Sequence, residues 1–102
     1  MIVDRDKILA VLREQRDHIE HAYGLRMIGL VGSVARCEAT LESDVDVLVD
    51  VVPARAPSMF KLFDAETELK EAIGAGLPVE FVFREAMRPS GRRLIERDLV
   101  PL

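Results

Sequence analysis

The chain has 102 residues, of which 49% are apolar and 31% are charged, and its formal net charge is −4. This length predicts a single domain over residues 1–102, and the composition excludes disordered, collagen-like and repeat proteins. The acidic balance argues against a dedicated nucleic-acid-binding protein, which usually carries a basic face, so no direct nucleic-acid binding is expected. A domain of this size leaves little room for a large substrate, part of which another molecule would have to hold.

The cysteine content and the hydropathy pattern indicate the cellular compartment of the protein. Cys37 is the single cysteine, which rules out an intramolecular disulfide. No apolar run approaches the roughly 20 residues that a membrane-spanning helix needs. Residues 4–7 are charged where a signal peptide would be apolar. We therefore expect a soluble, cytoplasmic protein with no membrane association.

The first half of the chain contains one helical pattern and two strand patterns. Helical spacing of apolar residues predicts an amphipathic helix over residues 4–23, which a left-handed cap at Gly24 would end. The apolar segment 26–31 predicts a buried strand that stops at Gly32. A short helical turn over 33–38 and a polar connection over 39–43 precede a second, valine-rich strand over 45–52. The apolar positions of the first helix are Ile8, Leu9, Leu12, Ile19 and Ala22.

The second half contains another helix, a third strand and a C-terminal segment. The second helix follows Pro57 and ends at Gly74, and Pro78 opens a strand over 79–83. Residues 84–102 predict a short helix or tail after a break at Pro89. Together these elements predict an α/β (α+β) fold, a short mixed sheet flanked by helices. The apolar helical positions are Met59, Leu62, Phe63, Ala65, Leu69, Ala72 and Ile73, and then Leu94, Ile95 and Leu99.

Two aspartates stand at the start of the second strand. Residues two apart on a strand point to the same face, so Asp44 and Asp46 lie side by side, roughly 7 Å apart along the backbone. The valines between and after them take the opposite face, which is free to be buried. Two neighbouring carboxylates repel each other unless a cation compensates, and Mg²⁺ prefers one or two carboxylates of this kind. A solvated strand end is the alternative interpretation of the pair.

A third carboxylate comes from the third strand. Glu80 is the only charge in a segment otherwise built to be buried, and a lone buried glutamate needs a partner. If this strand lies beside the second, Glu80 completes a three-carboxylate site for one or two metal ions. Such a site suits phosphoryl or nucleotidyl transfer, in which Glu80 would also help to take the proton of the attacking hydroxyl. The alternatives are an edge-strand acid facing water and a salt bridge to an arginine.

The loop after the first strand supplies candidate nucleotide-binding residues. A glycine after a strand allows close approach of a ligand to the backbone, and the turn that follows offers N–H groups and a hydroxyl to phosphate oxygens. Gly32 and Ser33 fit this role, and Arg36 would add a positive charge to the triphosphate. A turn glycine and a helix N-cap are the simpler interpretations of the first two residues.

The spacing of these residues resembles the nucleotidyltransferase superfamily of the DNA polymerase beta type. Gly32-Ser33, ten intervening residues and Asp44-Val45-Asp46 reproduce the family's G-S-x10-D-x-D pattern without gaps. The order of elements and the Arg-Pro segment before the last helix extend the likeness over nearly the whole chain. Within the superfamily, the chain is most similar to the minimal nucleotidyltransferases that act as MntA-type antitoxins to HEPN-type toxins.

The resemblance implies transfer of AMP from ATP, with Mg²⁺, to a tyrosine hydroxyl of a cognate HEPN ribonuclease toxin, which is thereby silenced. It assigns the metal to Asp44 and Asp46 and the nucleotide to Gly32 and Ser33. Two positions depart from the family pattern, because Glu80 stands in place of the usual aspartate and Cys37 in place of the usual glycine. The rival hypotheses are an antitoxin that neutralises its partner by binding alone, and a nucleotidyltransferase acting on a small molecule or an RNA end.

Overall fold

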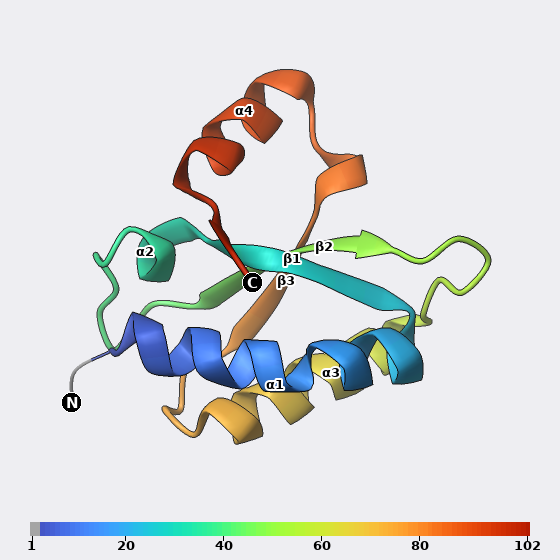
Figure 1. Cartoon of the computed structure of the whole chain (residues 1–102), viewed down its shortest axis with the longest axis horizontal. Helices are drawn as coiled ribbons and strands as arrows, with labels where there is room; N and C mark the ends of the chain where they lie inside the picture. The colour runs from blue at the N-terminus through green and yellow to red at the C-terminus, as the bar shows by residue number, and fades with distance from the viewer. Residues whose placement is uncertain (1–2) are drawn as a thin grey trace.

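The computed structural model describes residues 3–102 and confirms the α/β fold class (Figure 1). The first two residues of the predicted domain 1–102 lie outside the described part. No helix among the described residues is long and apolar enough to cross a membrane. In chain order the elements are α1 (Arg5–Tyr23), β1 (Leu25–Val31), α2 (Gly32–Ala35), β2 (Val45–Val51), α3 (Met59–Ile73), β3 (Val79–Phe83), the 3-10 helix η1 (Arg84–Ala86), α4 (Pro89–Asp98) and β4 (Val100–Pro101).

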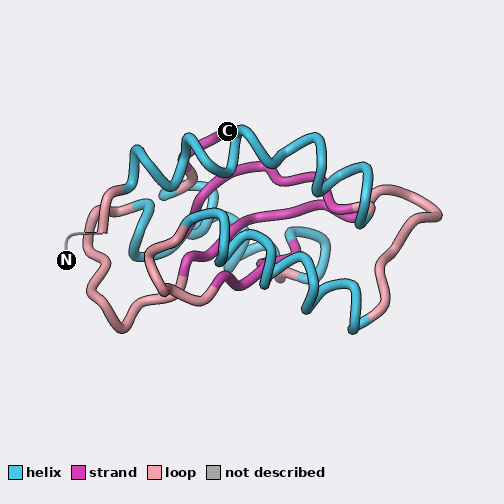
Figure 2. The backbone as a smooth tube through the Cα atoms, turned by 90° about the horizontal axis from the view of Figure 1, so that it is seen from below, coloured by secondary structure: helices cyan, strands magenta, loops and turns pink. Residues whose placement is uncertain are grey.

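The four strands form one mixed sheet in the order β3-β2-β1-β4. β1 runs antiparallel to both β2 and β4, whereas β2 and β3 are parallel and α3 provides the crossover between them. α1 and α3 lie side by side across one face of the sheet, and α4 lies on the other side (Figures 1 and 2). The start of β2 is therefore flanked by β1 on one side and by β3 on the other, which positions the carboxylates.

The two long helices begin and end where their sequences predict. Asp4 caps α1 by accepting a hydrogen bond from the Lys7 N–H, and Ser58 caps α3 in the same way. Gly24 and Gly74 end these helices in the left-handed conformation, with φ of 69° and 73°. Glycine adopts this conformation without the strain that a Cβ would cause. Gly24 thus turns the chain directly from α1 into β1.

The core lies between the sheet and the helices α1 and α3. Val45, Val47 and Val49 of β2 point into it, as the alternation on this strand predicts, and meet Leu12 of α1 and Leu69 of α3. Five apolar positions predicted on the helices are instead exposed. Their patterns identify helices correctly, but helical spacing does not distinguish the face that the sheet covers from the neighbouring positions. These residues are Ala22, Met59, Phe63, Ala72 and Leu94.

The C-terminal strand was not predicted from the sequence. Leu99 was expected within a helix, but α4 ends at Asp98, and Val100 and Pro101 pair with Leu30 and Gly29 of β1. Gly29 permits this contact because a Cβ at its position would clash with the carbonyl oxygen of Val100 and with the Leu99 side chain. β1 also carries a bulge next to Gly29. The close approach of two backbones explains the glycine inside an otherwise apolar strand.

The variant Gly29→Ala tests this close contact. We expect it to lose about 1–3 kcal/mol of unfolding free energy, as overpacking of a tight site usually costs, because the added methyl group displaces β4. Urea denaturation of both chains measures the difference. Gly91→Ala is the matched control, since a Cβ there meets only the end of the Met87 side chain, at 3.7 Å. A loss no larger than that of the control would contradict the described pairing.

Candidate active site

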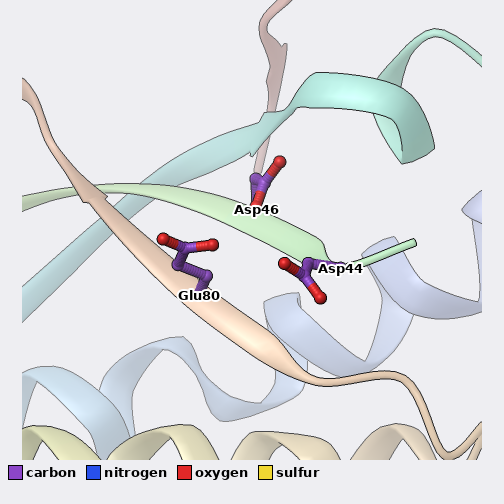
Figure 3. A group of neighbouring side chains, drawn as sticks. All are labelled: Asp44, Asp46 and Glu80. Carbon is purple, nitrogen blue, oxygen red and sulfur yellow. The ribbon is translucent and has the colours of Figure 1, made fainter. Parts of the chain in front are cut away.

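Three carboxylates meet at the start of β2 and β3, on the sheet face opposite the core (Figure 3). The parallel register places Asp46 directly beside Glu80, so both side chains project from the same face. Asp44 precedes β2 by one residue. Each of the three residues offers an oxygen atom, and these oxygens all lie within 4.8 Å of one another. The predicted juxtaposition of the second and third strands is therefore present.

Gly32 lies directly against this carboxylate group. Val31 is the register partner of Asp46, so the next residue, Gly32, begins α2 beside the Asp46 side chain. The φ angle of Gly32 is 76°, and a Cβ at its position would clash with Asp46 Oδ2. Two independent constraints, the left-handed backbone and the carboxylate contact, therefore require glycine here. Ser33 follows it as a half-buried residue, and no side chain caps this first turn.

Burial and the neighbouring negative charges both raise the pKa of the central carboxylate, Asp46. Burial of the Asp46 side chain raises its pKa first, and the charges of Glu80 and Asp44 raise it further. The positive charge of Arg36 acts in the opposite direction but is outweighed. The site thus concentrates negative charge that the protein itself does not neutralise.

Glu80 differs from its sequence-based description in one respect. The segment around it was expected to be buried, but β3 is an edge strand and Glu80 is exposed. The pKa of Glu66, a residue of α3, is raised first by burial and then by the negative charge of Glu80. Glu80 projects from the edge strand beside Asp46, on the face opposite the core. Because Glu80 is exposed, its charge does not require a partner, but its carboxylate still lies close to those of Asp44 and Asp46.

Arg36 lies near the site but is engaged by other residues. Its guanidinium group is exposed and contacts Glu38 at 3.1 Å and Asp98, in the last turn of α4, at 3.5 Å. These contacts with Glu38 and Asp98 raise its pKa, so it remains positively charged. Contact of Arg36 with a triphosphate stays a prediction, and it would require exchange of these exposed ion pairs, each of which is weak.

Cys37 has a left-handed backbone, with φ of 59°. This conformation is uncommon for residues other than glycine, and it matches the glycine that the sequence pattern leads one to expect at this position. The loop therefore keeps a glycine-like path although its residue carries a side chain, and the Cys37 side chain is exposed. Cysteine therefore replaces the expected glycine at position 37 with a strained, left-handed backbone.

Two polar contacts around the site were not predicted from the sequence. The guanidinium group of Arg5 donates a 2.8 Å hydrogen bond to the carbonyl of Ala35, the last residue of α2. Arg84 forms a two-point ion pair with Asp50, which holds the end of β3 against β2. The first contact spans 30 residues and the second 34, so no local spacing reveals either of them. Both secure the elements that carry the candidate site.

The raised pKa of Asp46 predicts how stability changes with pH. A carboxylate that binds its proton more tightly in the folded state stabilises the fold below its unfolded pKa, about 3.9, and this contribution is lost as the pH rises through the folded pKa. In EDTA, the chain should therefore lose stability relative to the variant Asp46→Asn between about pH 4 and neutrality. Melting temperatures of both proteins across this range measure the effect. Parallel profiles would show that Asp46 titrates alike in both states.

The donor set fits a hard divalent cation. Carboxylate oxygens are the ligands that Mg²⁺ prefers, and Mg²⁺ keeps several waters besides one or two carboxylates. Two of the three donors here, Asp44 and Glu80, are exposed, which leaves space for waters and for phosphate oxygens. A bound cation would also offset the repulsion that raises the Asp46 pKa. The site can therefore hold a divalent cation, and that role of Asp44, Asp46 and Glu80 stays a prediction.

Comparison with known proteins agrees with this arrangement. The family model described as nucleotidyltransferase domain matches residues 12–101. The chain is 30% identical to a protein adenylyltransferase, MntA, of Thermococcus cleftensis over 93% of this chain and 92% of that protein. It is 32% identical to a protein of Methanocaldococcus jannaschii named as a candidate protein adenylyltransferase, over 92% and 93% of the two chains.

A solved structure has the same fold. It is described as a candidate minimal nucleotidyltransferase, and it superposes with a TM-score of 0.68 at 28% identity. The match covers 92% of this chain and 95% of the other. The order of helices and strands described above is therefore shared along nearly the full length of both molecules.

Proposed function

Because this chain belongs to the nucleotidyltransferase domain family and is a nucleotidyltransferase, we propose that it transfers AMP from ATP to a tyrosine hydroxyl of a HEPN-type ribonuclease toxin and thereby neutralises it. The observation that carries the proposal is the group of three carboxylates beside the Gly32 turn. The names of the relatives, protein adenylyltransferases, support AMP as the group transferred and a protein as the acceptor.

In the proposed reaction Asp44, Asp46 and Glu80 hold one or two Mg²⁺. When bound, the metal offsets the negative charge of the phosphates and of the carboxylates. The backbone of Gly32 and Ser33 binds phosphate oxygens at the start of α2, and Arg36 adds positive charge at the edge of the site. These residues hold ATP with its α-phosphorus facing the acceptor hydroxyl.

The chemical step exchanges one phosphorus–oxygen bond for another. The tyrosine oxygen forms a bond to the α-phosphorus, and the bond from that phosphorus to the bridging oxygen breaks, which releases pyrophosphate. The Glu80 carboxylate accepts the proton of the attacking hydroxyl. Glu80 suits this role because it is the outermost of the three acids, on the edge strand, where a second protein has access. The reaction belongs in the cytoplasm, where ATP is available.

The test is a transfer assay with purified components. The chain is incubated with labelled ATP, Mg²⁺ and a purified HEPN-type protein, and the label is located by mass spectrometry of that protein. We expect label on a tyrosine of the partner and none when EDTA replaces Mg²⁺. Neutralisation of the partner without any label would favour an antitoxin that acts by binding alone. Label on a small molecule or an RNA end without the partner would favour the third alternative.

A further inference from the structure

The short helix α2 receives one of its hydrogen bonds from a distant side chain. It is a single turn, and the backbone N–H groups of residues 36–38 bond to the carbonyls of its first three residues, at 2.9 to 3.1 Å. The fourth carbonyl, that of Ala35, accepts its hydrogen bond from the guanidinium group of Arg5, at 2.8 Å. Because Ala35 is buried, water has little access to this carbonyl. Arg5 therefore completes the hydrogen bonding of the turn.

The immediate surroundings of Arg5 within α1 do not favour an arginine. Arg5 is the first residue of α1, where the helix dipole disfavours a positive charge. Its Nε atom is buried and has no hydrogen-bond partner among residues 3–102, which is unfavourable for a polar group that water does not reach. The Ala35 carbonyl lies at the negative end of the α2 turn and attracts the guanidinium group. The contact with α2 is therefore what favours a cationic donor at this position.

The other end of α2 lies against the carboxylates. Gly32 is so close to Asp46 Oδ2 that its position has no space for a Cβ. The turn has only four residues, and the Arg36 N–H closes it by donating to the Gly32 carbonyl, at 3.1 Å. A shift of Ala35 therefore moves Gly32 relative to Asp46. Arg5 itself belongs to α1, which covers the core face of the sheet near α2, whereas the carboxylates project from the opposite face (Figures 1 and 3).

We propose that Arg5 is a positioning residue for ATP, because its hydrogen bond to Ala35 fixes the α2 turn in the orientation that binds the phosphates. The proposed function assigns the phosphates to Gly32 and Ser33, so this inference rests on it. Arg5 acts through α2 and contacts neither ATP nor the acceptor protein. Its loss therefore weakens the binding of the nucleotide and leaves the binding of the acceptor unchanged.

Three single variants test the proposal by calorimetry with Mg²⁺ and a non-hydrolysable ATP analogue. Arg5→Met keeps an apolar stem but removes the guanidinium group, and we expect the Kd of the analogue to rise about tenfold. Arg5→Lys retains a cationic donor for the Ala35 carbonyl, so its Kd should stay within about threefold of that of the unmodified chain. Arg16→Met, the matched control, removes an exposed arginine of α1 and should leave the Kd unchanged. Circular dichroism verifies that each chain is folded at the temperature of the measurement.

Two results would overturn the proposal. One is an unchanged Kd in Arg5→Met together with a lower melting temperature, because Arg5 would then only stabilise the fold. The other is an equal rise of the Kd in Arg5→Met and Arg16→Met, because the effect would then come from the loss of any positive charge on α1.

Transfer kinetics separate this proposal from the proposed function. Arg5→Met should raise the KM for ATP about tenfold and leave the KM for the acceptor protein within about twofold of that of the unmodified chain. If Arg5→Met weakens binding of the analogue but the unmodified chain transfers no label, the proposed function is wrong and the role of Arg5 stands. If label transfer occurs with the same KM for ATP in both chains, the role of Arg5 is wrong and the function stands.

Discussion

Replacing Asp46 by asparagine should lower the rate of AMP transfer by about 10³-fold or more. Asp46 is the central member of the carboxylate group, half-buried between Glu80 and the Gly32 turn. Stabilisation of transition-state charge by a bound metal amounts to several kcal/mol, and each 1.4 kcal/mol changes the rate tenfold. The variant Asp46→Asn keeps the shape of the side chain but removes its charge. Single-turnover measurements with saturating ATP and Mg²⁺ quantify the loss.

The stability of the same variant distinguishes a lost catalytic group from a damaged fold. Asp46 carries a raised pKa in the folded state, so its charge opposes folding at neutral pH in the absence of metal. The Asp46→Asn chain should therefore be at least as stable as the unmodified chain in EDTA, while Mg²⁺ should raise the melting temperature of the unmodified chain alone. Asp17→Asn, an exposed acid on α1, is the matched control for charge. Full transfer by Asp46→Asn would remove the basis of the metal-site assignment.

The variant Gly32→Ala should lose about 100-fold in transfer rate, although no ionisable group changes. The added methyl group displaces the Asp46 carboxylate, and misplacement of a reacting group by about 1 Å is known to cost a factor of that size. The left-handed φ of 76° adds roughly 1–2 kcal/mol of destabilisation, because alanine adopts this conformation reluctantly. Transfer kinetics and urea denaturation measure the two effects separately.

Gly76→Ala is the matched control for Gly32→Ala. Gly76 has nearly the same backbone conformation, with φ of 74°, but a Cβ at its position meets no atom within 4 Å. Its replacement should therefore produce a similar loss of stability with no loss of transfer. If both variants transfer AMP at the same rate, the contact between Gly32 and Asp46 has no catalytic importance.

The sequence predicts the carboxylate site well because its signals are local. Asp44 and Asp46 share a strand face by simple alternation, and the Gly32-Ser33 turn stands at a fixed spacing from them. The place of Glu80 depends on which strands are neighbours, and the crossover through α3 makes β2 and β3 parallel partners with Asp46 beside Glu80. One topological inference, that of adjacent strands, was therefore enough to assemble the three acids.

The features that the sequence did not predict depend on distant contacts. Val100 and Pro101 are too few to give a strand pattern, and their pairing with β1 depends on space beside Gly29. The contact of Arg36 with Asp98 joins residues 62 positions apart, and binding of a phosphate by Arg36 stays a prediction. Met59 and Phe63 are apolar positions of the predicted second helix, yet they are exposed, because helical periodicity indicates an apolar face without indicating what covers it. In this molecule the sheet does not cover that face.

The attachment of α4 has a consequence for motion in the native state. This helix has no buried residue, and the chain beyond it rejoins the sheet through the two residues of β4. The free energy needed to lift this segment is therefore a fraction of that needed to unfold α1 and the central strands. Its amide hydrogens should exchange through local opening events. Such openings would uncover the sheet face that bears the carboxylates and leave the core that positions them intact.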